Sequence, residues 1–344
     1  MKYYTKYSPR RNNENGRLRA LYALGVLFFV CSAVAGLMLG STSLSLHAIF
    51  DALKDKNNAS AAYRIFSYVR IPRVASSLLC GAALSVSGAV FQCVLANRLA
   101  SPSIIGVNSG AGLAVTLCTA LGIYGGWRVS LAAFVGAFLT VMLVSLTARR
   151  FGTRSGTLIL IGVAVNALLG ALSDSVVTFI PDVGVMTNDF RIGDFSSAAL
   201  TKLSGAVIPV LLSIALLLLL SKQLDVLTLG EESASGLGMN TSLMRTVFLI
   251  LSAILAGCAV SIAGLVSFVG LMVPHALRRL SRGCHVHLIL LCALWGGGFV
   301  CLCDTVARVA FAPYEISVGI ITAFLGAPFF IFILLRGKGA GRDA

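Results

Sequence analysis

The chain carries a series of apolar stretches, each about as long as a helix needs to cross a bilayer. A helix crosses ~30 Å of hydrocarbon with about 20 apolar residues. Lipid offers the backbone no hydrogen-bonding partner, so continuous apolar segments of this length favour helices. Polar breaks separate ten candidate spans: 18–40, 74–96, 105–124, 128–148, 156–180, 203–221, 243–264, 267–281, 286–303 and 316–335. The sequence therefore predicts an all-α polytopic membrane protein with about ten transmembrane helices.

The composition agrees with this prediction and argues against a nucleic-acid partner. Hydrophobic residues make up 57% of the 344 and charged residues 12%, whereas a soluble domain carries about 25% charged residues. The formal net charge is +14, but the basic residues are scattered between apolar blocks, as in membrane topology signals. The nine cysteines follow no disulfide or metal spacing. We interpret them as packing residues, and we expect no metal site.

Positive charge predicts the orientation, because cytoplasmic loops of membrane proteins carry an excess of Lys and Arg. With the N-terminus inside and ten spans, most of the 27 Lys and Arg residues fall in inside segments. Both termini are therefore expected in the cytoplasm. The predicted organisation is a cytoplasmic tail over 1–17, a single transmembrane domain over 18–336 with a long inside loop at 222–242, and a second tail over 337–344.

A cluster of arginines opposes this charge rule. Arg64, Arg70 and Arg73 lie in the predicted outside loop 41–73. One interpretation is that the guanidinium groups reach lipid headgroups at the interface. The other is a cationic platform for an acidic partner outside the membrane, because arginine pairs with carboxylates through a two-pronged fork.

The chain has no recognisable loop for ATP phosphates. No G-x-x-x-x-G-K-[ST] pattern occurs, and "GKGAG" near the end does not satisfy it. Energy for any transport would then come from another subunit or from an ion gradient. In the inside loop, Thr228 and Glu231 have capping-box spacing, which predicts that a short helix begins there. Such a helix is an ordinary connector in most membrane proteins.

Three long motifs resemble a known family. They are "RIPRVASSLLCGAALSVSGAVFQCVLANRLASPSIIGVNSGAGLAV", "GLVSFVGLMVPHALRRLSR" and "VGIITAFLGAPFF". They resemble the bacterial ABC importer permeases for iron–siderophore complexes, haem and vitamin B12, the FecCD/BtuC-like family. The likeness covers nearly the whole chain after about residue 20. It implies a BtuC-like permease fold with ten spans and both ends inside, and a transport subunit rather than an enzyme.

The resemblance also implies partners. They are two cytoplasmic ATPase subunits that bind ATP and Mg, a periplasmic or lipid-anchored substrate-binding protein, and a second permease copy in a homodimer, with a heterodimer left open. The permease itself would bind no cofactor. It would lie in the lipid of the bacterial cytoplasmic (inner) membrane and import an iron(III)-siderophore, haem or cobalamin-type complex. The sequence leaves open which of these chelates is the cargo.

The resemblance further assigns roles to particular residues. Docking of the binding protein falls to Arg70, Arg73 and Arg308, the last on the loop after the ninth span. Coupling to the ATPase falls to Glu231, Glu232, Ser233, Ala234, Leu237 and Gly238. The turn with Asn97 and Leu99 would narrow the cytoplasmic end of the pore, and Ser155 lies on the same predicted side. From their place in one span, rather than from the resemblance, Asn166 and Asp174 are further candidates for the translocation path.

Two points limit these assignments. Asn166 and Asp174 lie eight residues apart in one predicted span, hence roughly on one helix face, but a structural hydrogen-bonding role for Asp174 is an equal alternative. The outside segment "DVGVMTNDFRIGDFSSAAL" lacks a Trp that family members often carry.

The alternative function is an ion-coupled secondary transporter, which needs carboxylates near the membrane midplane, and only Asp174 qualifies. A membrane enzyme would need a catalytic constellation, and none is apparent.

Overall fold

The computed structural model describes residues 8–40, 60–151, 155–198, 200–278, 280 and 284–339, with the side chains of 8–15, 148–151, 155, 334 and 336–339 outside the description. Every regular element in these ranges is a helix. The elements are α1 (Ser8–Met38), α3 (Ala61–Arg64), η1 (Ile65–Arg70), α4 (Ile71–Val94), η2 (Pro102–Ile105), α5 (Val107–Ala120), α6 (Gly126–Phe151), α7 (Ser155–Phe179), α8 (Pro181–Ile192), α9 (Leu200–Leu219), α10 (Ser221–Leu227), α11 (Glu231–Gly236), α12 (Thr241–Ala263), α13 (Val269–Arg278), α14 (His285–Val309) and α15 (Val318–Gly339).

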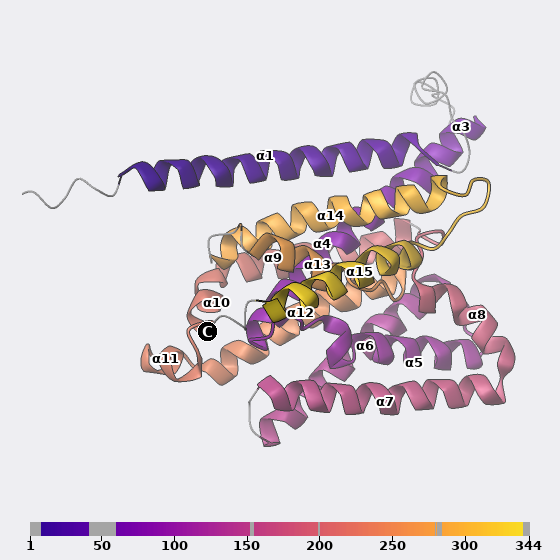
Figure 1. The fold of residues 1–344 in the computed structure, drawn as a ribbon. Coiled ribbons are helices and arrows are strands. Elements are labelled where there is room, and N and C mark those ends of the chain that lie inside the picture. Colours follow the sequence, from indigo (N-terminus) through magenta and orange to yellow (C-terminus); the bar gives the residue numbers. More distant parts are fainter. Residues whose placement is uncertain are drawn as a thin grey trace, which may run out of the picture.

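The long helices run side by side in one bundle (Figure 1). Two short helices mark its opposite ends, which we call the α11 end and the α8 end. Helix α1 begins at the α11 end and α15 finishes there, while the connection between α14 and α15 lies at the α8 end (Figure 1). The two ends of the described chain therefore lie on the same side of the bundle as α11.

The predicted all-α membrane fold is confirmed. Among the described residues, seven helices are long and apolar enough to cross a membrane: Gly16–Met38, Ala61–Val94, Gly126–Thr147, Gly156–Phe179, Leu200–Leu219, Thr241–Ala263 and His285–Val309. Shorter apolar helices cover Val107–Ala120 and Val318–Ile333, and α13 occupies the predicted eighth segment. Each of the ten predicted segments thus coincides with a helix.

The centre of the bundle is α4, which packs most extensively against α14 and α12. Small residues make this close packing possible. A Cβ atom added at Gly81 would overlap the carbonyl oxygen of Gly296, and one at Gly88 would overlap that of Gly270. Lipid tails are as apolar as side chains, so helices in a membrane associate through such close backbone approach. The core therefore depends on glycine where a soluble bundle would use large side chains.

Candidate functional site

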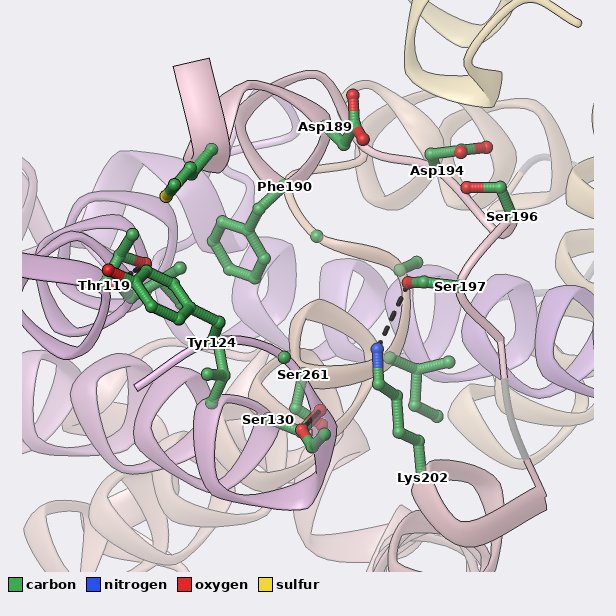
Figure 2. A pocket seen from close by; sticks show the side chains of 18 of the residues that line it. Thr119, Tyr124, Ser130, Asp189, Phe190, Asp194, Ser196, Ser197, Lys202 and Ser261 are labelled. Carbon is green, nitrogen blue, oxygen red and sulfur yellow. Dashed lines mark hydrogen bonds between the residues drawn. The ribbon is translucent and has the colours of Figure 1, made fainter. Parts of the chain in front are cut away.

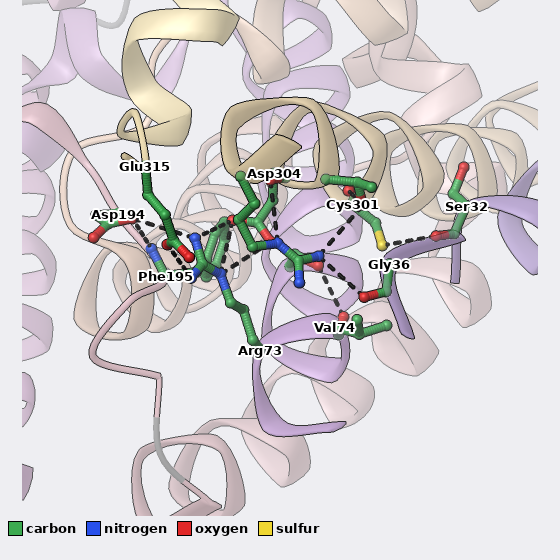
Figure 3. Close-up of polar contacts among 12 residues, drawn as sticks. Ser32, Gly36, Arg73, Val74, Asp194, Phe195, Cys301, Asp304 and Glu315 are labelled. Carbon is green, nitrogen blue, oxygen red and sulfur yellow. Dashed lines mark hydrogen bonds and ion pairs between the residues drawn. The ribbon is translucent and has the colours of Figure 1, made fainter. Parts of the chain in front are cut away.

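A buried charge cluster lies at the α8 end, centred on Arg73 of α4 (Figure 3). The Arg73 guanidinium donates Nε to both carboxylate oxygens of Asp304 at 3.1 and 3.2 Å. Its Nη1 donates to Glu315 Oε2 at 2.7 Å, and Nη2 lies 3.9 Å from Asp194 Oδ1. The cluster therefore joins α4, α14, the segment after α8 and the segment before α15.

Asp304 also holds a second arginine, and a third lies close by. Arg308 Nε lies 3.2 Å from Asp304 Oδ2, and Arg308 Nη2 donates to the carbonyl oxygen of Gly36 at 3.2 Å. Arg70 Nη1 donates to the carbonyl oxygens of Leu37 and Met38, each at 2.8 Å. The last carbonyls of a helix have no partner within it. Arg70 and Arg308 supply donors to those of α1, where positive charge is also favourable.

The three arginines predicted to dock a binding protein are therefore buried and engaged within the chain. Arg70, Arg73 and Arg308 are 2%, 5% and 3% exposed. Their predicted placement on loops is wrong, because α3, η1 and α4 run without a break from residue 61 to 94 and α14 extends to Val309. Acids pair with Arg73 and Arg308, and carbonyl oxygens of α1 accept hydrogen bonds from Arg70 and Arg308, so the helices continue through all three arginines. Whether these residues contact a binding protein stays a prediction.

The surface beside the cluster is acidic and aromatic. Glu315 is the acid of the cluster most open to solvent, with 31% of its side chain exposed. Tyr314 and Phe311 are exposed in the same connection between α14 and α15. Arg64, which has no place in the family motif, is exposed on α3. Any partner approaching this end would meet these side chains before it reached Arg73.

At the opposite end, α11 forms the predicted short helix of the inside loop, but the predicted capping box is wrong. Helix α11 begins at Glu231 behind Gly230, whose φ of 99° is accessible to glycine. Thr228 lies at the end of α10, and its hydroxyl donates to the carbonyl oxygen of Asp225 at 2.6 Å. Thr228 keeps a helical backbone conformation (φ −73°, ψ −12°) at the end of α10, whereas an N-cap residue is usually extended. Gly230 therefore makes the turn into α11.

Helix α11 buries one residue and presents the others outward. Ala234 is fully buried, whereas Glu232, Ser233 and Leu237 are exposed, with Leu237 66% exposed. Glu231 pairs with Arg245 Nη2 of α12 at 3.6 Å, which fixes the helix on the bundle. Gly238, with φ 81°, turns the chain away after α11. The short helix α11 therefore presents the apolar side chain of Leu237 and the carboxylate of Glu232 to the outside of the bundle.

The predicted gate residues Asn97 and Leu99 lie in a tight turn at the α11 end. Asn97 Oδ1 accepts a hydrogen bond from the backbone N–H of Leu99 at 2.9 Å, which is an Asx-turn. Ala96 has φ 45°, a left-handed conformation that is costly for any residue other than glycine. These contacts show how the turn is held. They do not test a gating role.

The other predicted path residues separate from one another. Asn166 donates to the carbonyl oxygens of Ser103 and Ile104, both at 3.0 Å, and accepts from Ser109 Oγ at 2.6 Å, so it fixes the turn at η2 to α7. Asp174 is exposed and pairs with Arg191 of α8 at 3.4 Å. The side chain of Ser155 lies outside the described residues.

Two polar contacts link elements at the α11 end. Gln92, interpreted from the sequence as a link between helices, accepts from Arg278 Nη2 at 3.2 Å and so joins α4 to α13. His285 at the start of α14 contacts Asp225 of α10 through both its backbone N–H, at 2.8 Å, and its ring Nδ1, at 2.6 Å. Sequence reasoning missed this second pair, because the residues lie far apart in the chain and belong to no motif.

The comparison with known proteins decides the family. A model of the FecCD transport family matches residues 26–336, most of the chain. The chain belongs to the FecCD transport family. Its FecCD relatives include the hemin transport system permease protein HmuU of Yersinia pestis, 34% identical over 94% of this chain and 98% of the relative. The vitamin B12 import system permease protein BtuC of Yersinia enterocolitica is 36% identical over 80% of this chain and 83% of the relative.

A solved structure agrees with the FecCD assignment. It shows an inward-facing conformation of a metal-chelate type ABC transporter. Its TM-score is 0.80 at 31% identity, covering 92% of this chain and 99% of that one. This FecCD chain is therefore a transport permease that spans a membrane with a bundle of apolar helices.

Proposed function

We propose that this chain is the permease subunit of an ABC importer for a large chelate of the iron(III)-siderophore, haem or cobalamin type. The match to the FecCD family over residues 26–336 carries this proposal. ATP hydrolysis lies on two separate ATPase subunits, and a substrate-binding protein delivers the cargo from outside the cell. The permease lies in the bacterial cytoplasmic membrane and works with a second copy of itself.

The ATPase subunits contact the bundle at α11. The exposed Leu237 offers an apolar anchor, and the neighbouring Glu232 offers a charge. Energetic hot spots of interfaces are apolar anchors that enter a pocket of the partner. Buried Ala234 and the pair between Glu231 and Arg245 support this role, because they couple movement of α11 to α12.

The substrate-binding protein docks at the α8 end. An acidic side chain of that protein reaches Arg73 by replacing Glu315, which is the most exposed acid of the cluster. Asp304 is fully buried and stays in place beneath it. In this proposal the cluster exchanges one carboxylate for another, so the buried guanidinium is never left without a counter-charge.

Cargo moves between the two permease copies. Helices α7 and α15 carry exposed large apolar side chains along much of their length, including Leu160, Phe179, Phe324 and Leu335. Such faces suit lipid or a second copy of the chain. Asp174, exposed near the α8 end of α7, supports a polar lining there, whereas the hydrogen bonds of Asn166 support a structural role.

The proposal is tested by uptake into proteoliposomes that hold the permease, the ATPase encoded beside it and the cognate binding protein. Labelled ferric siderophore, haem and cobalamin are supplied in turn. We expect uptake of one of them that requires ATP inside and survives an ionophore that collapses ion gradients. Uptake that needs the gradient and no ATP would establish the alternative, an ion-coupled secondary transporter.

The coupling role is tested with Leu237→Asp, and Leu121→Asp serves as a matched control. Leu121, 78% exposed against 66% for Leu237, lies in the turn after α5 at the other end of the bundle. Burying a leucine side chain contributes about 1.5–3 kcal/mol. We therefore expect Leu237→Asp to lower co-purification of the ATPase by about ten-fold or more, and Leu121→Asp to leave it unchanged. Equal co-purification by both variants would exclude α11 as the contact.

A further inference from the structure

A cavity of about 600 Å³ opens at the α8 end between α5, α6, α8, α9 and α12. Lys202, near the start of α9, points into it and donates to Ser197 Oγ at 3.1 Å (Figure 2). The hydroxyl-bearing residues Ser130 and Ser261 line the same cavity. The hydroxyls of Ser130 and Ser261 already donate to the carbonyl oxygens of Gly126, at 3.4 Å, and Cys258, at 2.8 Å. The donors that the wall offers an anion are therefore the Lys202 ammonium and the Ser197 hydroxyl, whose oxygen accepts from Lys202.

Lys202 forms no ion pair with any residue in the described part of the chain. None of the ion pairs among the described residues includes it. The acids Asp189 and Asp194 line the other rim of the cavity (Figure 2). Asp194 already accepts the backbone N–H of Phe195 at 2.7 Å and lies beside Arg73. A half-buried ammonium in an apolar helix is costly without a partner, so an external anion would stabilise it.

The cavity continues into an apolar groove that leads toward the membrane. This second cavity, about 330 Å³, shares Lys202, Ser130 and Ser261 with the first and runs between α6 and α9. Its apolar lining includes Trp127, Leu131, Phe134 and Pro209. Trp127 and Leu131 are more than half exposed, as expected for a lipid-facing surface. Tryptophan is typical of the membrane interface, where headgroups lie.

We propose that this cavity binds a phospholipid of the leaflet at the α8 end. The phosphate lies against the Lys202 ammonium and the Ser197 hydroxyl, and one acyl chain occupies the groove between α6 and α9. A free phosphate would satisfy the ammonium but leave the groove empty. A phospholipid fits both the ammonium site and the groove, because it carries a charged phosphate and an apolar acyl chain in one molecule.

Native mass spectrometry of the full-length protein in detergent tests this, with phosphatidylglycerol as the probe. We expect Lys202→Gln to weaken retention of the lipid by about ten-fold, because a charge-assisted hydrogen bond is lost. Lys222→Gln is the matched control, since Lys222 is an exposed lysine on α10 at the opposite end and its loss should change nothing. Equal retention by wild type and Lys202→Gln overturns the proposal.

A groove-filling variant tests the acyl chain separately. Gly205 lies one turn after Lys202 and lines the groove, and a Cβ there would meet no atom within 4 Å. Gly205→Leu should therefore fold, gain helix propensity and fill the groove. We expect Gly205→Leu to weaken binding of phosphatidylglycerol and to leave the weak affinity for inorganic phosphate unchanged. If Gly205→Leu binds the lipid as wild type does, or if inorganic phosphate displaces the lipid fully, the site takes phosphate alone and the proposal fails.

Discussion

Asp304 is the residue on which the α8 end most depends. It is 0% exposed and forms ion pairs with both Arg73, at 3.0 Å, and Arg308, at 3.2 Å. An unpaired charge in an apolar interior is very costly. The Asp304 carboxylate lies between the guanidinium groups of Arg73 and Arg308, so each of the three buried charges has an opposite charge beside it. Since Arg308 also binds the end of α1, Asp304 indirectly fixes the first helix to the bundle.

We expect Asp304→Asn to destabilise the protein by about 3–5 kcal/mol, because the arginines keep their burial and lose their shared counter-charge. The measurement is thermal unfolding in detergent. Asp174→Asn is the control: its carboxylate is exposed and pairs with the exposed Arg191, so the loss should not exceed about 1 kcal/mol. Similar unfolding midpoints for the two variants would mean that the buried cluster contributes no more than a surface pair.

The sequence could identify these arginines but not their environment. The hydrogen-bonding partners of Arg73, Asp304 and Glu315, lie more than 200 positions away along the chain, and nothing in a local pattern reveals such a pair. The same reason explains why the contact between Asp225 and His285 was not predicted. Asn166 was assigned to the path from its place in a span, but its amide is used by the backbone turn at η2.

At the scale of elements, apolar length predicted every long helix, and the errors lie at helix ends. The predicted second span begins at 74 and the ninth finishes at 303, whereas the helices reach from 61 and to 309. Charged residues end an apolar stretch in sequence, but a paired arginine does not end a helix. The predicted capping box is also an error at a helix end, because Thr228 completes α10 in a helical conformation and α11 begins three residues later.

Close packing of α4 gives a prediction at this scale. We expect Gly88→Ala to cost about 1–3 kcal/mol, because its Cβ would overlap the Gly270 backbone and push α13 away from α4. Gly112→Ala on α5 is the control, since open space surrounds that position and alanine favours a helix. Thermal unfolding of both variants checks this. A loss for Gly112→Ala as large as for Gly88→Ala would show that packing against α13 is not the cause.

For the whole molecule, the arrangement of its two ends limits how it can work. The exposed Leu237 lies at the α11 end, and the charge cluster lies at the α8 end with long apolar helices between them (Figure 1). Helix α11 packs on α12, which packs closely on α4, so the proposed coupling has a continuous route of packed helices to the cluster. This separation has meaning only if the two ends face different compartments, and the charge distribution of the sequence predicts that they do.

Cysteine labelling tests that orientation. In a background with the exposed Cys31 and Cys284 changed to serine, Ser233→Cys reports on α11 and Tyr314→Cys on the connection beside the cluster. Both positions are exposed. A membrane-impermeant maleimide should label Tyr314→Cys in spheroplasts and Ser233→Cys only in inverted vesicles. Labelling of both from one side would contradict a cytoplasmic α11 opposite an external cluster, and the coupling and docking roles would then fail together, because each requires its partner to be in a different compartment.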